Sequence, residues 1–200
     1  WAFSQRGLQA RLGLRRLVLL NDFTALALAL PDLPADELEA IGGGAAVAGA
    51  PLAVLGPGTG LGVSGLLRQG GTRIPVSGEG GHVTLAAGDD EEARIIARVR
   101  AQVGHVSAER LLSGEGLVRL AEAIAALRGE TRAALTAADV ARGALEGGDA
   151  VCRAALETFC ALLGSVNKVF CLGSPAGSFG LGPRFFGGSV DGDFFGTVMP

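Results

Sequence analysis

The apolar residues of this chain change their spacing near residue 90, and this change limits the folds that the chain can adopt. Before it, apolar runs at residues 52–55 and 63–67 flank a glycine-rich segment, and a further β-like run covers residues 72–76. Strand, turn and strand in this order predict a β-hairpin with a third strand after it. After residue 90, apolar residues recur every three or four positions, as in amphipathic helices. The pattern therefore predicts a sheet followed by a group of helices.

Four helices are predicted in the second half of the chain. Residues 91–103 place Ile95, Val99 and Val103 four positions apart, on one helical face. Residues 136–139, Thr-Ala-Ala-Asp, fit a capping box that opens a further short helix. The other two helices each carry apolar residues along one side: Leu117, Leu120, Ala121, Ile124 and Leu127 in the first, and Ala155, Phe159, Leu162, Leu163 and Val166 in the second.

The first part of the chain adds a strand and a helix. Residues 17–20 form a continuous apolar run, which predicts a buried strand that ends at the polar pair Asn21 and Asp22. Residues 24–30 are rich in Ala and Leu and predict a helix that stops before Pro31. The Pro- and Asp-rich residues 31–39 predict a connector, with a domain boundary or hinge near Pro31. The phenylalanine- and glycine-rich segment from Phe170 onward permits no assignment.

Composition and charge exclude several classes of protein. Apolar residues make up 48% and charged residues 18%, which excludes a disordered chain. The 17 Lys and Arg against 20 Asp and Glu give a net charge of -3, which argues against nucleic-acid and membrane partners. We find neither an apolar run of the roughly 20 residues that cross a bilayer nor a signal peptide, so a cytoplasmic location is expected. The three cysteines, Cys152, Cys160 and Cys171, lack metal-ligand spacing and are interpreted as buried thiols.

Residues 56–62 carry a glycine at every second position, with Thr59 in the middle. Alternating glycines allow successive backbone N–H groups to turn toward an anion, and the Thr59 hydroxyl can bind a phosphate oxygen. The segment matches neither the dinucleotide fingerprint nor the Walker motif, which needs Gly-Lys-Ser/Thr. By itself it is compatible both with phosphate binding and with a tight hairpin that binds nothing.

Five polar residues are candidates for ligand binding. Asn21 and Asp22 follow a predicted strand, where open α/β sheets bind ligands, although either residue could simply cap the next helix. Glu79 and His82 lie three apart among glycines and could reach one small polar ligand, although a lone histidine is commonly structural. Glu109 could instead pair with a neighbouring arginine or face solvent. Together, a carboxylate base, an acid–histidine pair, a further glutamate and a glycine-rich loop predict phosphoryl transfer to a polyol hydroxyl.

Four sequence blocks in fixed order resemble the bacterial ATP-dependent glucokinases. They are LLNDFTA at residues 19–25, GTGLGV at 58–63, GEGGHV at 78–83 and GHVSAER at 104–110, and the likeness extends over residues 1–165. The resemblance implies an α/β, actin/hexokinase-like (ribonuclease H-like) fold of two domains that close over a cleft. Residues 1–31 would end the small α/β domain, which carries the catalytic aspartate, and residues 32–200 would belong to the large α/β domain. The resemblance also implies a homodimer that phosphorylates glucose with ATP and Mg²⁺.

The same resemblance implies roles for individual residues. Asp22 matches the catalytic base that takes the proton from the sugar 6-hydroxyl. Asn21, Asp22, Glu79, His82 and Glu109 match ligands of the glucose hydroxyls. Gly58, Thr59 and Gly60 match the loop near the ATP phosphates, and no residue matches a metal ligand. The alternatives are a sugar-binding relative without catalysis, such as a sensor or degenerate kinase, and a kinase for another hexose.

The sequence departs from the family pattern in three places. It contains no Asp-x-Gly-Gly-Thr hairpin ahead of residue 17, it has Phe179 where the family has a glycine, and it stops before the last helices of the family. The chain is therefore expected to be a fragment that lacks the N-terminal phosphate-binding hairpin and the C-terminal end.

Overall fold

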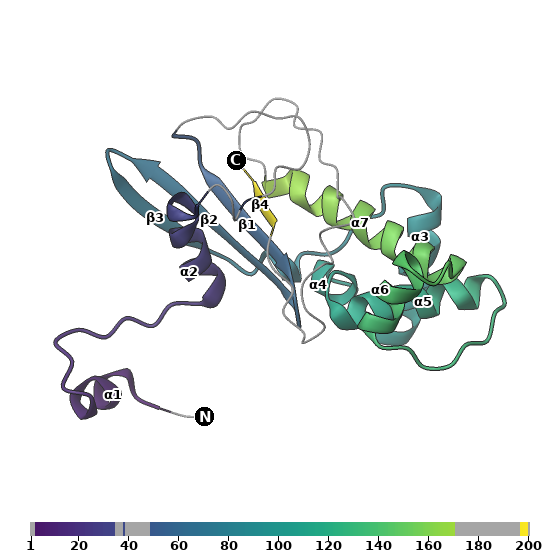
Figure 1. Ribbon diagram of the computed structural model, residues 1–200, viewed down its shortest axis with the longest axis horizontal. Coiled ribbons are helices and arrows are strands. Elements are labelled where there is room, and N and C mark those ends of the chain that lie inside the picture. The colour runs from purple at the N-terminus through teal and green to yellow at the C-terminus, as the bar shows by residue number, and fades with distance from the viewer. Residues whose placement is uncertain (1–2, 35–37, 39–48, 171–196, 200) are drawn as a thin grey trace.

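A four-stranded antiparallel sheet lies beside a group of helices in the computed structural model (Figure 1), which describes residues 3–34, 38, 49–170 and 197–199. The strands are β1 (Leu52–Pro57), β2 (Leu61–Gln69), β3 (Thr72–Ser77) and β4 (Thr197–Met199). They are ordered β3-β2-β1-β4, and each neighbouring pair is antiparallel. This arrangement confirms the predicted hairpin and third strand.

The turn between β2 and β3 shows how sequence fixes the register of the sheet. Gln69 pairs with Thr72, so Gly70 and Gly71 alone form the turn. Both glycines have positive φ angles, 56° and 78°, which a two-residue hairpin turn that follows the twist of its strands requires. A glycine pair at this point therefore sets which residues of β2 and β3 face each other.

Between residues 90 and 170 the chain is mainly helical, as predicted. The helices are α3 (Asp90–Val103), α4 (Ala108–Leu111), α5 (Gly114–Leu127), α6 (Ala137–Leu145) and α7 (Ala150–Phe170). The predicted capping box is present, because Thr136 accepts a hydrogen bond from the Asp139 N–H and Asp139 accepts one from the Thr136 N–H. Capping of this kind satisfies N–H groups that have no partner inside the helix.

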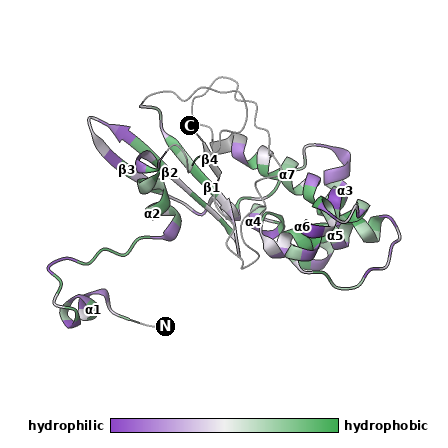
Figure 2. Cartoon of the chain, viewed as in Figure 1, coloured by the Kyte–Doolittle hydropathy of each residue, from purple (hydrophilic) through white to green (hydrophobic). Residues whose placement is uncertain are grey.

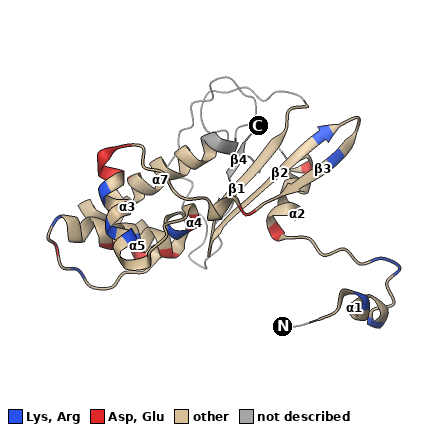
Figure 3. Ribbon diagram, turned by 180° about the vertical axis from the view of Figure 1, so that it is seen from behind, with Lys and Arg blue, Asp and Glu red and all other residues tan. Residues whose placement is uncertain are grey.

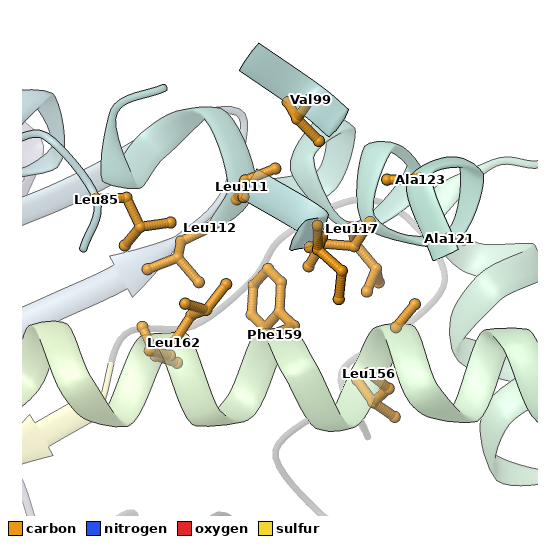
Figure 4. Packing of buried hydrophobic residues seen from close by; sticks show 14 of the residues in the cluster. Leu85, Val99, Leu111, Leu112, Leu117, Ala121, Ala123, Leu156, Phe159 and Leu162 are labelled. Carbon is orange, nitrogen blue, oxygen red and sulfur yellow. The ribbon is translucent and has the colours of Figure 1, made fainter. Parts of the chain in front are cut away.

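The larger hydrophobic core lies between α7 and the helices that precede it. Phe159 is 2% exposed, and its ring points from α7 toward Leu111, Leu112 and Leu117 (Figure 4). Strand β1 is largely hydrophobic (Figure 2), because Val54 faces one hydrophobic core and Leu55 faces the other, whereas α7 buries one face and exposes residues such as Glu157 on the other. Leu127 is 49% exposed although its spacing predicts burial, since it is the last residue of α5.

A smaller core joins helix α2 (Asp22–Ala29) to the sheet. Ala27 and Leu30 pack with Val54 of β1 and Leu66 of β2, and all four are at most 4% exposed. The helix ends at Ala29 and is followed by the 3-10 turn η1 (Leu30–Asp32), so the prediction that it stops before Pro31 is confirmed. This packing fixes α2, and with it Asp22, against the sheet.

The predicted buried strand at residues 17–20 is wrong in the described structure. Val18, Leu19 and Leu20 are 53%, 51% and 53% exposed and form no strand. A strand needs a neighbour that supplies hydrogen bonds, and none of the strands within the described residues lies beside this segment. Helix α1 (Gln5–Arg11) precedes the segment, has no buried residue and lies apart from the sheet (Figure 1).

The cysteines follow the prediction where the structure describes them. Cys152 is buried, Cys160 is partly buried, and both are free thiols. Burial raises the pKa of Cys152, and it raises the pKa of Cys160 to about 11. Both thiols are therefore protonated at neutral pH, the form that is a poor nucleophile and metal ligand. Cys171, Phe179 and most of the phenylalanine-rich segment lie outside the described residues, as do residues 35–37 and 39 of the predicted connector.

An ion pair ties the segment before α6 to the start of α7. The Arg132 guanidinium donates to both carboxylate oxygens of Asp149, with Nη1–Oδ1 at 2.8 Å. Asp149 also accepts from the N–H groups of Val151 and Cys152, at 2.9 and 3.0 Å. The hydrogen bonds from Arg132, followed by the one from the Cys152 amide, hold the pKa of Asp149 well below its usual range.

We expect Asp149→Asn to lower the free energy of unfolding at pH 7 by about 1 kcal/mol, because hydrogen bonds to a charged group are stronger than those to a neutral amide. The pKa of Asp149 is depressed in the folded state, so the pair contributes its full stabilisation above the unfolded-state pKa of about 3.9 and loses it as the pH falls from there toward the folded-state pKa. Urea unfolding at several pH values measures this dependence. The difference from the unsubstituted chain should stay constant from pH 7 to about pH 5 and shrink between about pH 4 and pH 2. Glu157→Gln, an exposed carboxylate on the same helix, is the control, and a difference for Asp149→Asn that stayed constant down to about pH 2 would contradict the assignment.

Candidate active site

The glycine-rich segment forms the tight end of the β1–β2 hairpin. Pro57 pairs with Leu61, and residues 58–60 make the turn. Inside the turn the Gly58 N–H donates to the Gly60 carbonyl at 2.8 Å. The Gly58 carbonyl accepts from the Gly114 N–H at 2.9 Å, which attaches the turn to the start of α5. The turn is thus held in place by backbone contacts, while the Thr59 side chain is exposed.

Three of the predicted site residues come together beside this hairpin. His82 ends the 3-10 turn η3 (Gly80–His82), Glu79 precedes that turn, and Glu109 lies on α4. The imidazole of His82 lies between the two carboxylates, with Nδ1 3.9 Å from Glu79 Oε2 and Nε2 3.7 Å from Glu109 Oε1. These distances exceed those of hydrogen bonds, so the three side chains retain hydrogen-bonding capacity for a ligand.

Glu109 also joins this cluster to the hairpin. Its Oε2 accepts a hydrogen bond of 3.3 Å from the Leu61 N–H, at the first residue of β2. Its side chain is 38% exposed, against 62% for His82 and 85% for Glu79. Glu109 therefore binds the backbone of the hairpin, rather than pairing with Arg110 or only facing solvent.

Two glycines of the predicted motifs allow close packing at this end of the sheet. A Cβ on Gly81 would overlap the Leu61 carbonyl oxygen, and a Cβ on Gly62 would overlap the ring of Phe23. Glycine at position 81 lets η3 approach the start of β2, and glycine at position 62 lets α2 lie on β2. Both contacts bring motifs that are distant in the sequence to the glycine-rich hairpin.

Asn21 and Asp22 begin helix α2. Asn21 Oδ1 accepts from the N–H groups of Phe23 and Thr24, at 3.0 and 3.3 Å, so Asn21 does cap the helix. Asp22 is exposed at the first turn, which Figure 3 shows as an acidic position, and its Oδ1 accepts from the Phe23 N–H at 2.9 Å. The capping explanation is therefore confirmed for Asn21, whose side-chain NH₂ group can still donate to a ligand.

Thr24 and Ser77 connect this helix to the Glu79 segment. Their hydroxyl oxygens are 2.8 Å apart, and Thr24 is 4% exposed. Asp22 and Glu79 each lie two residues along the chain from this pair, so the aspartate and the His82 cluster are attached to the same end of β3. Thr24 and Ser77 were not predicted as site residues. The sequence signal for Thr24 was a hydroxyl residue in the otherwise apolar run 24–30.

The described residues contain neither a side-chain cluster suited to a metal ion nor a membrane-spanning helix. Within the described ranges, no group of three or more His, Cys, Asp or Glu side chains could hold a metal ion. In the same part of the chain, no helix combines the length and apolar character needed to cross a bilayer.

Comparisons with known proteins agree with the family resemblance of the four sequence blocks. The glucokinase family model matches residues 1–179. The chain is 52% identical over 197 residues to the glucokinase of Aromatoleum aromaticum, covering 98% of this chain and 59% of that protein. It is 50% identical over 192 residues to the glucokinase of Chromobacterium violaceum, covering 94% of this chain and 55% of that protein. The chain thus spans 55–59% of the length of these relatives.

Solved structures agree on the fold. A glucokinase from an Antarctic psychrotroph matches with a TM-score of 0.76 and 37% identity, over 84% of this chain and 52% of that one. The glucokinase of Balamuthia mandrillaris in complex with glucose matches with a TM-score of 0.54 and 23% identity, over 58% of this chain and 35% of that one. These matches confirm the expected hexokinase-like α/β fold.

Proposed function

This chain belongs to the glucokinase family, and we propose on that basis that the protein transfers the γ-phosphate of ATP to the 6-hydroxyl of glucose. The observation that carries the proposal is the cluster in which His82 lies between Glu79 and Glu109, beside the glycine-rich hairpin. Carboxylates accept hydrogen bonds from sugar hydroxyls, and an imidazole can donate or accept. A ring of hydroxyls around a hexose suits such a set of groups.

Asn21 and Asp22 complete the proposed sugar site from helix α2. The free amide hydrogens of Asn21 bind a sugar hydroxyl oxygen. Asp22 takes the proton of the 6-hydroxyl as that oxygen attacks the γ-phosphorus of ATP, whose bond to the bridging oxygen breaks, so that ADP leaves. Asp22 suits this role because it is exposed and its helix is fixed to the sheet by Thr24, Ala27 and Leu30. A general base accelerates such a step by about 10²–10⁴-fold. Most of the remaining acceleration comes from holding the hydroxyl in line with the γ-phosphate.

The turn Gly58-Thr59-Gly60 is proposed to face the phosphates of ATP. Thr59 is exposed there and can donate its hydroxyl to a phosphate oxygen. Mg²⁺ is proposed to arrive with the nucleotide, since it is commonly held by substrate phosphates and waters with few protein ligands. When bound, it neutralises charge on the phosphate oxygens.

The domain division is a further part of the proposal. Residues 1–31 are assigned to the end of the small domain, and residues 32–200 to the large domain. The end of helix α2 at Ala29 supports a boundary near Pro31, while the packing of Ala27 and Leu30 on β1 and β2 attaches this helix to the large domain. In this division α2 carries Asp22 along the junction of the domains. A homodimer, as in the family that the sequence resembles, and a cytoplasmic location complete the proposal.

Titration of glucose into the 200-residue chain, followed by calorimetry, tests the sugar site directly. We expect saturable heat with glucose and none with galactose, because the cluster presents fixed acceptors to one arrangement of hydroxyls.

Glu79→Gln should weaken glucose binding by about tenfold, since it replaces a charged acceptor with a neutral one. Glu91→Gln, an exposed carboxylate on α3, should leave binding unchanged. Absence of glucose heat from a folded sample would contradict the proposed site, and equal heat with galactose would favour a kinase for another hexose.

A further inference from the structure

The Glu109 carboxylate lies directly against the backbone of Gly60. A Cβ built on Gly60 would overlap Glu109 Oε2 and would lie 3.0 Å from Glu109 Cδ. No other residue is among the three nearest atoms to that position. The space that a side chain would occupy at position 60 is therefore filled by the functional group of Glu109.

The backbone of Gly60 does not itself require glycine. Its φ angle lies outside the left-handed region, unlike those of Gly70 and Gly71 in the next turn of the sheet. Alanine at position 60 is thus compatible with the chain conformation. The obstacle is the end of a flexible side chain, which can rotate away without unfolding the hairpin.

The position of the Glu109 carboxylate determines two other contacts. Its Oε2 accepts from the Leu61 N–H at 3.3 Å, and its Oε1 lies 3.7 Å from His82 Nε2. Rotation of the side chain away from position 60 breaks the first contact and removes the carboxylate from the second. One methyl group on the hairpin turn would therefore disrupt the cluster.

We propose that Gly60 is a positioning residue for the sugar site, which has to be glycine so that Glu109 can lie against the hairpin and face His82. This inference rests on the proposed function, because it takes the His82 cluster as the sugar site. It gives position 60 a role distinct from contact with phosphate. The turn assigned to ATP and the cluster assigned to glucose then share a structural element, since Gly60 and Leu61 both contact Glu109.

A double-mutant cycle on glucose affinity tests the inference. Glu109→Ala should raise the glucose Kd roughly 10- to 100-fold, as expected for the loss of a charged hydrogen-bonding group. Gly60→Ala alone should raise it about tenfold or more, with an unchanged melting temperature. In the Glu109→Ala background, Gly60→Ala should change the Kd by less than about twofold, because no carboxylate remains to be displaced. The inference would be overturned if Gly60→Ala alone left the glucose Kd unchanged. It would also be overturned if Gly60→Ala weakened glucose binding equally in the presence of Glu109 and in the Glu109→Ala background.

The matched control is Gly65→Ala on β2, the strand that follows the turn. The nearest atoms to a Cβ there are at 3.5–4.0 Å, so the methyl group fits, and glucose binding should remain as in the unsubstituted chain. A loss of glucose binding in Gly65→Ala equal to that in Gly60→Ala would overturn the inference, since it would show that any added methyl group in the β1–β2 hairpin weakens binding.

A second measurement separates this inference from the proposed function. In ¹⁵N-labelled chain, Glu109→Ala should move the Leu61 amide-proton resonance, because it removes the acceptor of that N–H. When residue 60 is alanine, the same Glu109→Ala change should leave the Leu61 resonance in place. Failure of the unsubstituted chain to bind glucose would count against the proposed function alone. A Leu61 response that persists with alanine at position 60 would count against the Gly60 inference alone.

Discussion

Asp22→Asn is expected to lower the rate of glucose phosphorylation by about 10²–10⁴-fold, because it removes the proposed general base. The glucose Kd should rise by at most about tenfold, as for Glu79→Gln, because a neutral oxygen replaces a charged acceptor. Asparagine preserves the shape of the side chain, and its oxygen can keep the contact of 2.9 Å with the Phe23 N–H. The loss should therefore appear in kcat while helix α2 and the bound sugar stay in place. A coupled assay of glucose 6-phosphate formation, together with calorimetry, measures both quantities.

The matched control is Asp90→Asn, which changes an acidic residue in the first turn of α3. This residue shares the type and helical position of Asp22 and lies in an element that contributes no predicted site residue. Because the chain spans 55–59% of its relatives, turnover can also be measured in a hybrid completed with the remaining residues of the Aromatoleum aromaticum relative. Turnover within threefold of the unsubstituted protein would rule out Asp22 as the base.

Phe159→Ala is expected to lower the free energy of unfolding by about 3–5 kcal/mol, the usual cost of removing a buried aromatic side chain. Phe159 is 2% exposed and lies between α7 and the residues around Leu112 and Leu117 (Figure 4). For a domain of this size, a loss of this magnitude corresponds to a decrease in Tm of roughly 10 °C. Urea unfolding and a thermal scan measure the two quantities.

Two variants separate the loss of packing from a general weakening of α7. Phe159→Leu keeps most of the apolar volume and should cost about 1–2 kcal/mol. Glu157→Ala changes an exposed residue of the same helix and should stay within about 0.5 kcal/mol of the unsubstituted chain. If Phe159→Ala lowered the free energy of unfolding by no more than Glu157→Ala, the placement of α7 in the larger core would be wrong.

The elements of the second half could be predicted because their signals are local. The capping box at Thr136 and Asp139 and the apolar face of α7 each depend on residues within a few turns of one helix. The β1–β2–β3 meander is equally local, since Gly70 and Gly71 alone form the turn between β2 and β3. The failure at residues 17–20 has the opposite cause. An apolar run specifies a strand only together with a neighbouring strand, and that neighbour is a property of the tertiary structure.

The sequence by itself determined which residue types are available for the site and the order of the blocks that carry them. Only the tertiary structure decided that His82 lies between Glu79 and Glu109, and that Glu109 lies against Gly60. These contacts join α4, η3 and the hairpin, and they depend on how closely backbones can approach one another. Local periodicity carries no information on such distances between elements. The absence of a Cβ at a few glycines is what allows them.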